Sequence, residues 1–236
     1  MTRWPPDKRI RIREASMADL EDITTTAQEG FPDDPEFNYR FPDRDKFPQD
    51  NRKWVRQEYT EYLKQPSKYA VMVATASDND DRVVALSVWD KAVLVPHKGG
   101  DLGVPADPNE PPARRDVNPV HFRAFAQRMD QSFHQYFASY GEQQMHLWLL
   151  ATHPSFRRRG AGSRLCQWGL GQAAGKGIHT TVLASAMGRR LYQELGFALN
   201  GSFIIRVDDE TDHLELWALT HDPPSSPAWG WSCDIM

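Results

Sequence analysis

The chain has 236 residues, with 28 Lys and Arg against 32 Asp and Glu and a formal net charge of −4. This balance leaves no global basic surface and argues against a protein that binds nucleic acid. Its two cysteines, Cys166 and Cys233, are too few for a disulfide framework, and the sequence has no apolar run long enough for a signal peptide or a membrane span, so we expect a cytoplasmic protein with no membrane partner.

The N-terminal part of the chain alternates strand and helix patterns. Residues 10–14 alternate apolar and polar side chains, as in a half-buried strand, and residues 16–19 resemble a capping box that opens a helix to about residue 29. Residues 30–50 are rich in Pro, Asp and aromatic side chains and predict a loop. Its acidic residues either form an exposed surface or attract a cationic substrate; they are Asp33, Asp34 and Glu36.

Further elements follow in the middle of the chain. We expect a helix over about 51–64 that Pro66 ends, then strands at 69–76 and 82–90 joined by a hairpin turn. Residues 96–119 combine few apolar side chains with many Pro and Gly, which predicts a flexible insertion. Apolar side chains at helical spacing predict an amphipathic helix over 120–140. We therefore expect a single domain over 1–236, with a C-terminal tail from about 221 that contains Trp229 and Trp231.

The most informative segment is 147–163, which reads LWLLATHPSFRRRGAGS. An apolar strand pattern ends at Pro154, three arginines follow, and small residues then open a helix. The first backbone N–H groups of a helix have no partner within it, and the helix dipole adds positive potential there. Arginine adds forked donors for phosphate oxygens. The segment therefore predicts a diphosphate-binding turn at the end of a strand.

Two other phosphate-binding motifs fit less well. Residues 171–177 are one residue short of a Walker loop and lack Ser or Thr after Lys176, so Gly175 or Gly177 is better explained as a helix C-cap. The dinucleotide-binding glycine pattern is missing. The helix that ends there has small and apolar residues on one side, which predicts that Cys166 is a core residue and not a nucleophile.

A second segment, 180–197, reads TTVLASAMGRRLYQELGF and completes a resemblance. The two segments together resemble motifs A and B of the GNAT superfamily of acetyl-CoA-dependent N-acetyltransferases. Motif A reads roughly L-x-V-x-P-x-Y-R-x-x-G-x-G, and motif B reads roughly N-x-x-A-x-x-L-Y-x-x-x-G-F. The chain matches them at Leu150, Pro154, Arg157, Gly160, Gly162, Leu191, Tyr192, Gly196 and Phe197, and it departs mildly at Thr152, Phe156, Ser185 and Gly188. The likeness is close over 157–197.

This resemblance implies an α/β (α+β) fold. The sheet would be mixed and mostly antiparallel, with six or seven strands flanked by helices, and would splay between the motif A strand and the following strand. Acetyl-CoA would enter that gap as cosubstrate and extend beside the first strand. The implied cosubstrate-binding residues are Leu150, Ala151, Thr152, Arg157, Arg158, Arg159, Gly160, Ala161, Gly162, Ser163, Ser185 and Gly188.

The resemblance also implies the chemistry of the site. A neutral amine attacks the thioester, backbone N–H groups near Leu150 and Ala151 stabilise the oxyanion, and a weak acid protonates the departing thiolate. Tyr192 occupies the family's tyrosine position and is the predicted acid; its alternative is a core aromatic. His146 is the best candidate base, because strand alternation gives it the same face as Leu150 and Thr152. The histidines show no metal-ligand spacing, so no metal is expected.

Three functions stay open from the sequence. The first is an enzyme that acetylates a primary amine of a small molecule, the second is a protein N-terminal or lysine acetyltransferase, and the third is an acetyl-CoA-binding module with little catalysis. His213 and Glu215, on one face of the last predicted strand, either line an acceptor site or form a solvated pair. The acceptor is not identified, and a monomer and a homodimer are both compatible with the sequence.

Overall fold

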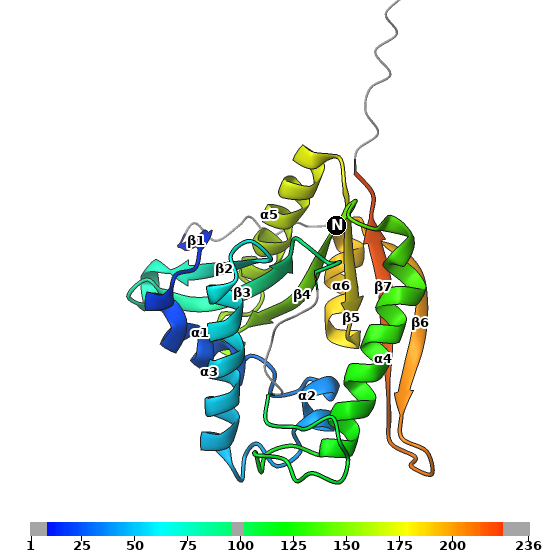
Figure 1. The fold of residues 1–236 in the computed structure, drawn as a ribbon. Coiled ribbons are helices and arrows are strands. Elements are labelled where there is room, and N and C mark those ends of the chain that lie inside the picture. The colour runs from blue at the N-terminus through cyan, green and yellow to red at the C-terminus, as the bar shows by residue number, and fades with distance from the viewer. Residues whose placement is uncertain (1–8, 96–101, 224–236) are drawn as a thin grey trace, which may run out of the picture.

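Seven strand segments pair into one open sheet in a computed structural model, which describes residues 9–95 and 102–223 (Figure 1). Their order is β1-β2-β3-β4-β5-β7-β6, and every neighbouring pair is antiparallel except β4 and β5. The strands are β1 (Ile10–Glu14), β2 (Tyr69–Ala76), β3 (Arg82–Asp90), β4 (Gln144–Thr152), β5 (His179–Ala184), β6 (Ala198–Arg206) and β7 (His213–His221). The predicted mixed, mostly antiparallel sheet is confirmed.

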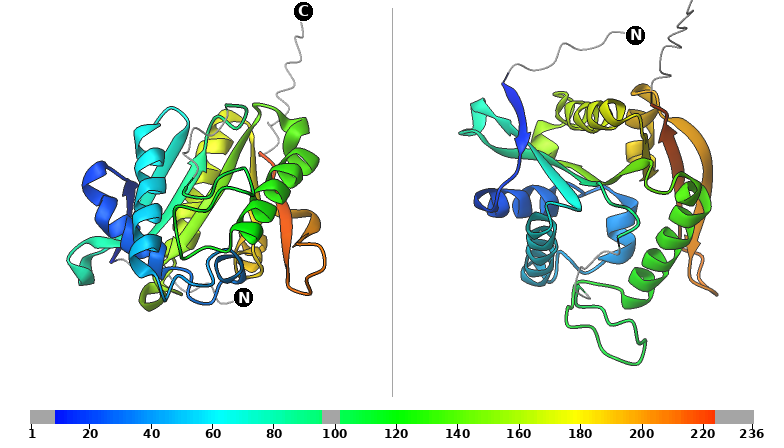
Figure 2. Two further views of the ribbon diagram at one scale, coloured as in Figure 1. Left: turned by 60° about the horizontal axis from the view of Figure 1, so that its bottom comes forward. Right: turned by 45° about the horizontal axis from the view of Figure 1, so that its top comes forward.

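Helices cover both faces of this sheet (Figure 2). They are α1 (Leu20–Glu29), α2 (Pro35–Arg40), α3 (Pro48–Lys64), α4 (Pro119–Phe137), α5 (Ala161–Lys176) and α6 (Ala186–Glu194). The right-hand view of Figure 2 shows α5 and α6 on one face and α1, α2, α3 and α4 on the other. α5 is the crossover that parallel strands require, since it connects β4 to β5.

The core under α5 is tightly packed. Leu165, Cys166, Gly169 and Ala173 are all buried, as the helical pattern predicted. A Cβ atom on Gly169 would lie 2.2 Å from the ring of Trp89, so this close approach of helix and sheet requires glycine. Burial raises the pKa of the Cys166 thiol to about 12, which agrees with a core residue and not a nucleophile.

The prediction of a loop over residues 30–50 is partly wrong. It contains α2, and α3 begins within it at Pro48. Asp34 caps α2 by accepting a hydrogen bond from the Glu36 backbone N–H at 2.9 Å, and Pro35 occupies the first helical position, where its missing N–H costs nothing. The many prolines of this segment favoured the loop prediction, although Asp followed by Pro, a signal for the start of a helix, is present in the sequence and begins this six-residue helix.

The described part of the predicted insertion is anchored by a buried polar network. Arg114 donates two hydrogen bonds to Asp116, at 2.7 and 2.6 Å, and Asn51 of α3 donates to the same carboxylate at 2.9 Å. These contacts hold residues 102–118 against α3. Residues 96–101, Trp229 and Trp231 lie outside the described residues. Within residues 9–95 and 102–223, no helix combines the length and apolar character needed to cross a membrane.

Candidate active site

The sheet opens between its two parallel strands. β4 and β5 pair from Gln144 opposite His179 to Leu147 opposite Val182, and their pairing stops there. β4 nevertheless continues to Thr152 beside β3, and β5 continues to Ala184 beside β7. Residues 148–152 of β4 therefore have no partner on β5, and the two strands separate at this end of the sheet (Figure 1).

A β-bulge marks the point of separation. Val88 of β3 lies opposite Leu149 and the next residue, Trp89, lies opposite Leu147, so Trp148 is an extra residue on β4. A bulge bends its strand and increases the local twist, which turns the second half of β4 away from β5. Trp148 is 46% exposed, and its indole N–H donates to the Tyr62 hydroxyl at 2.8 Å.

The free edge of β4 presents alternate backbone groups to the gap. The His153 N–H donates to the Val84 carbonyl at 2.9 Å, so in this antiparallel ladder the backbone groups of Ala151 also face β3. Those of Leu150 and Thr152 then face the gap, as the resemblance implied. The expectation that the Ala151 N–H lines the gap beside that of Leu150 is wrong, because the ladder directs it the other way.

The start of α5 fits a diphosphate. Gly160 occupies the N-cap position in the left-handed region, with φ of 84°, and no side chain among the described residues caps the helix. The first turn has no acidic residue, so its free N–H groups and the positive end of the helix dipole are not neutralised by the protein. A Cβ atom on Gly162 would lie 3.5 Å from Leu191 and 3.7 Å from Leu150, which places this turn next to the free half of β4.

The three arginines before α5 have different surroundings. Arg157 donates to the Gly30 carbonyl at 2.9 Å and lies 3.7 Å from Asp33, while Arg159 forms two 2.9 Å contacts with Asp78. Among the described residues, none forms a hydrogen bond or an ion pair with exposed Arg158. Arg158 also has a φ of 63°, a left-handed conformation that costs a non-glycine residue about 1–2 kcal/mol.

We expect Arg158→Gly to separate binding from stability. Glycine adopts the left-handed conformation without steric cost, so the melting temperature should stay the same or rise. Loss of the guanidinium should raise the Kd for acetyl-CoA about 10-fold at low salt, with a smaller effect at high salt. Calorimetry at two ionic strengths measures this. An unchanged affinity at low salt would show that Arg158 does not contact the cosubstrate.

Tyr192 lies on α6, the helix that follows β5 on the other side of the gap. Its ring packs over Gly188, where an added Cβ atom would lie 2.9 Å from the ring and 3.4 Å from the hydroxyl. Tyr192 is 5% exposed, and no described residue hydrogen-bonds to its hydroxyl. Burial, with the nearby Cys166, Glu36 and Asp34, raises its pKa well above the usual value, so the phenol keeps its proton at neutral pH.

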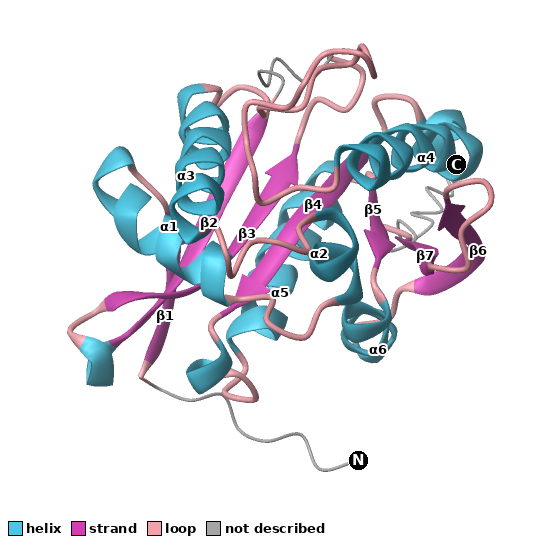
Figure 3. Cartoon of the chain, turned by 90° about the horizontal axis from the view of Figure 1, so that it is seen from below, coloured by secondary structure: helices cyan, strands magenta, loops and turns pink. Residues whose placement is uncertain are grey.

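The start of α6 is joined to α2. Ser185 caps α6 by accepting a hydrogen bond from the Gly188 N–H at 3.4 Å, and its hydroxyl donates to the Asp34 carboxylate at 3.2 Å. α2 also packs against α4 and β7. Figure 3 shows α2 in front of the space between β4 and β5. Asp34, which the sequence placed in an acidic loop, therefore contacts the start of the helix that carries Tyr192, and Glu36 follows it by two residues on α2.

His146 does not share a face with Leu150 and Thr152, so the prediction from strand alternation is wrong. The extra residue Trp148 reverses the alternation: Leu147 and Leu150 both pack in the core under α5, while the His146 ring lies 5.1 Å from that of Phe133 on α4. His146 is buried, and burial lowers its pKa to about 3, which makes it a poor proton acceptor.

A polar chain fixes the His146 ring. The Gln144 side-chain amide donates to the Phe137 carbonyl, so its oxygen accepts from the Thr181 hydroxyl at 3.0 Å. The Thr181 oxygen then accepts from His146 Nδ1 at 2.9 Å. This arrangement assigns the proton of the neutral ring to Nδ1 and gives His146 a structural role between β4 and β5.

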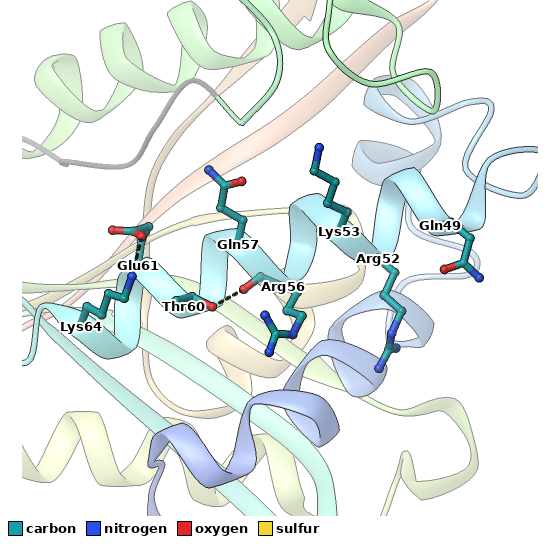
Figure 4. Close-up of a pocket in the computed structure, with 8 residues that line it drawn as sticks. All are labelled: Gln49, Arg52, Lys53, Arg56, Gln57, Thr60, Glu61 and Lys64. Atoms are coloured by element: carbon teal, nitrogen blue, oxygen red, sulfur yellow. Dashed lines mark hydrogen bonds and ion pairs between the residues drawn. The ribbon is translucent and has the colours of Figure 1, made fainter.

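A separate hollow lies along the outer side of α3 (Figure 4). Its lining residues are Gln49, Arg52, Lys53, Arg56, Gln57, Thr60, Glu61 and Lys64. Arg52 and Arg56 are already paired with Glu21 of α1, at 2.9 and 2.6 Å, and none of the residues belongs to the two motifs. We therefore do not place acetyl transfer there.

His213 and Glu215 are exposed on β7, on the same face of that strand. In the part of the chain that the structure describes, no group of three His, Cys, Asp or Glu side chains is arranged to hold a metal ion.

Comparisons with known proteins match this region and this fold. The model of the acetyltransferase (GNAT) family matches residues 119–197, which include β4, the start of α5 and Tyr192. An "Acetyltransferase" of Stachybotrys chartarum is 26% identical over 210 residues, covering 89% of this chain and 87% of that protein. A structure titled histone acetyltransferase HPA2 and related acetyltransferase, from Corynebacterium glutamicum, is 22% identical with a TM-score of 0.59, covering 93% of this chain and 99% of the other. The structure of a polyamine N-acetyltransferase of Drosophila melanogaster is 14% identical, with a TM-score of 0.58. The match covers 90% of this chain and 99% of that chain.

Proposed function

We propose that the chain is a member of the GNAT acetyltransferase family and that it transfers the acetyl group of acetyl-CoA to a primary amine of a small molecule. One observation carries this proposal: the unpaired half of β4, the uncapped start of α5 and α6, the helix that carries Tyr192, lie around the same opening in the sheet. The proposal also places the reaction in a single cytoplasmic domain that acts as a monomer or homodimer.

The residues that would hold the cosubstrate follow from the geometry. The free N–H groups at the start of α5 and the Arg158 guanidinium suit the diphosphate, and the backbone of Leu150 and Thr152 suits an extended polar chain along the edge of β4. When bound, acetyl-CoA supplies a thioester that an amine attacks. The Leu150 N–H then donates to the carbonyl oxygen as it gains negative charge.

Tyr192 is suited to protonate the leaving thiolate. Its buried phenol keeps its proton at neutral pH, and its hydroxyl is not committed to another described residue. A proton donor held beside the departing sulfur accelerates the collapse of the tetrahedral intermediate. We assign this general-acid role to Tyr192.

The position of α2 supports a small acceptor. α2 packs against α4 and β7, and the Asp34 carboxylate is tied to Ser185 at the start of α6. A helix in front of the opening leaves less room for an extended peptide than an uncovered edge does. This favours a small amine over a protein N-terminus or lysine as acceptor.

A panel of acceptors tests the proposal. Release of free thiol from acetyl-CoA is followed with polyamines, agmatine, arylalkylamines, amino sugars and peptides. We expect turnover with at least one small amine and little with peptides. Higher turnover with peptides would instead support a protein acetyltransferase, and background release across the panel would support a binding module without catalysis.

A further inference from the structure

The proposed reaction needs a proton acceptor that the assignments above do not supply. An alkylamine has a pKa of about 10.4, so only about 10⁻³ to 10⁻⁴ of it is neutral near pH 7. Because only the neutral amine is a nucleophile, the site must remove one proton from the ammonium. His146, with a pKa of about 3 and a buried ring on the wrong face, does not suit this role.

Glu36 has the position of such an acceptor. It lies in the first turn of α2, two residues after Asp34, whose carboxylate is hydrogen-bonded to Ser185 at the start of α6. Gly188, in the first turn of α6, packs against the Tyr192 ring. The negative charge of Glu36 is also one of the causes, after burial and Cys166, that raise the pKa of the Tyr192 phenol.

The Glu36 carboxylate is partly buried and lacks a partner. No hydrogen bond or ion pair connects its oxygens to another described residue. Arg40, one turn later, donates from Nε to the Glu36 backbone carbonyl, and its guanidinium lies 4.0 Å from the centre of the Phe125 ring. A carboxylate removed from water without compensation destabilises a protein, so its presence calls for a functional explanation.

We propose that Glu36 is the general base that takes the proton from the acceptor ammonium, directly or through one water molecule. This inference rests on the proposed function. It also gives the direction of approach, since a base on α2 serves an amine that enters from the face of the sheet carrying α1, α3 and α4.

Each proton and bond in the proposed acetyl transfer can then be accounted for. The ammonium gives one proton to Glu36, and its nitrogen lone pair attacks the thioester carbon to form a C–N bond. The tetrahedral intermediate breaks its C–S bond, and the sulfur takes the proton of Tyr192. The second proton on nitrogen returns to the Tyr192 oxygen, while Glu36 releases its proton to solvent. The products are the acetamide, free CoA and one proton.

The environment of Glu36 supports this role. Burial, with the nearby charge of Asp34, raises the pKa of Glu36 to about 7, and Arg40 partly opposes the shift. A base is most effective when its pKa is close to the working pH. The groups around the site are Asp34 and Arg40 on α2, Tyr192 on α6, and, beyond Arg40, Glu58 on α3 and Arg114 in the loop 102–118.

The test compares Glu36→Gln with wild type on the best amine of the panel, from pH 6 to pH 10. We expect kcat/KM to fall about 100-fold or more at pH 7. The defect should shrink as the pH approaches the pKa of the amine, where no base is needed. The Kd for acetyl-CoA should not change. Glu194→Gln, on the exposed side of α6, is the matched control and should stay within about 2-fold of wild type.

Stability provides an independent readout. Since the folded pKa of Glu36 lies above its unfolded value, the folded state binds the proton more tightly, and stability declines as pH rises from about 4.5 to about 7. Glutamine removes this dependence, so Glu36→Gln should melt at the same temperature as wild type or higher at pH 8. Glu36→Ala adds a second variant, whose rate formate should partly restore.

The outcomes separate the two proposals. If wild type acetylates an amine and Glu36→Gln keeps its rate and pH profile, the inference about Glu36 is wrong and the proposed function stands. A defect that is the same at every pH, with a lowered melting temperature and no rescue by formate, also overturns it as a merely structural effect. If wild type acetylates no amine, both proposals fail.

Discussion

Replacing Tyr192 with phenylalanine should lower kcat about 10²- to 10³-fold while leaving the fold intact. The substitution removes the proton that the leaving thiolate requires, and a positioned general acid contributes about this factor. The ring remains packed against Gly188 and Phe197, and no described residue loses a hydrogen bond. Steady-state kinetics at saturating acetyl-CoA, with a thermal melt on the same sample, measure both effects.

The matched control for this variant is Tyr59→Phe. Tyr59 on α3 is also buried, and its hydroxyl is likewise without a hydrogen-bond partner among the described residues. Loss of that hydroxyl should change neither kcat nor the Kd for acetyl-CoA. If Tyr192→Phe turned over at the wild-type rate, the general acid would have to be another group, and Tyr192 would be a core aromatic.

Replacing Ser163 with aspartate should abolish most acetyl-CoA binding and yet not harm the protein. Ser163 lies in the first turn of α5, where an acidic side chain interacts favourably with the helix dipole and the free N–H groups. The same negative charge would oppose a diphosphate bound to those groups. We expect the Kd to rise about 100-fold, since like charges a few ångströms apart repel strongly in a partly buried site.

Ser163→Asn separates charge from shape, because asparagine has nearly the same size as aspartate and no charge. Its Kd should stay within a few-fold of wild type, and the melting temperature of Ser163→Asp should equal or exceed that of Ser163→Asn. Equal Kd values for the two variants, measured by calorimetry, would show that the diphosphate does not bind at the start of α5.

Much of the fold could be predicted because its elements carry local signals. The strands over 69–76 and 82–90 have the predicted bounds, since each is a β-rich run enclosed by turn residues. Gly177 ends α5 in the left-handed conformation, as a glycine after a helical pattern suggests. The motif segments placed the start of α5 and Tyr192 on the correct elements.

The site was less predictable because its details depend on contacts between distant segments. The extra residue Trp148 reversed the alternation of β4, and only its pairing with β3 reveals this. Similarly, nothing near Glu36 in the sequence indicates that Asp34 meets Ser185, which is 151 residues away. The sequence predicts Arg157 and Arg159 as phosphate ligands. In the structure Arg157 donates to the Gly30 carbonyl, and Arg159 donates to the Asp78 carboxylate.

The short pairing between β4 and β5 has a mechanical consequence. Among the residues that the structure describes, only the four pairs from Gln144–His179 to Leu147–Val182 join β1–β4 to β5–β7 within the sheet. The sheet thus has two parts that pair over a short segment, and the residues proposed to face the thioester come from both: Leu150 on β4 and Tyr192 on α6, the helix after β5. In the proposed reaction, a cosubstrate that contacts both parts would therefore also fix the position of the phenol relative to the free edge of β4.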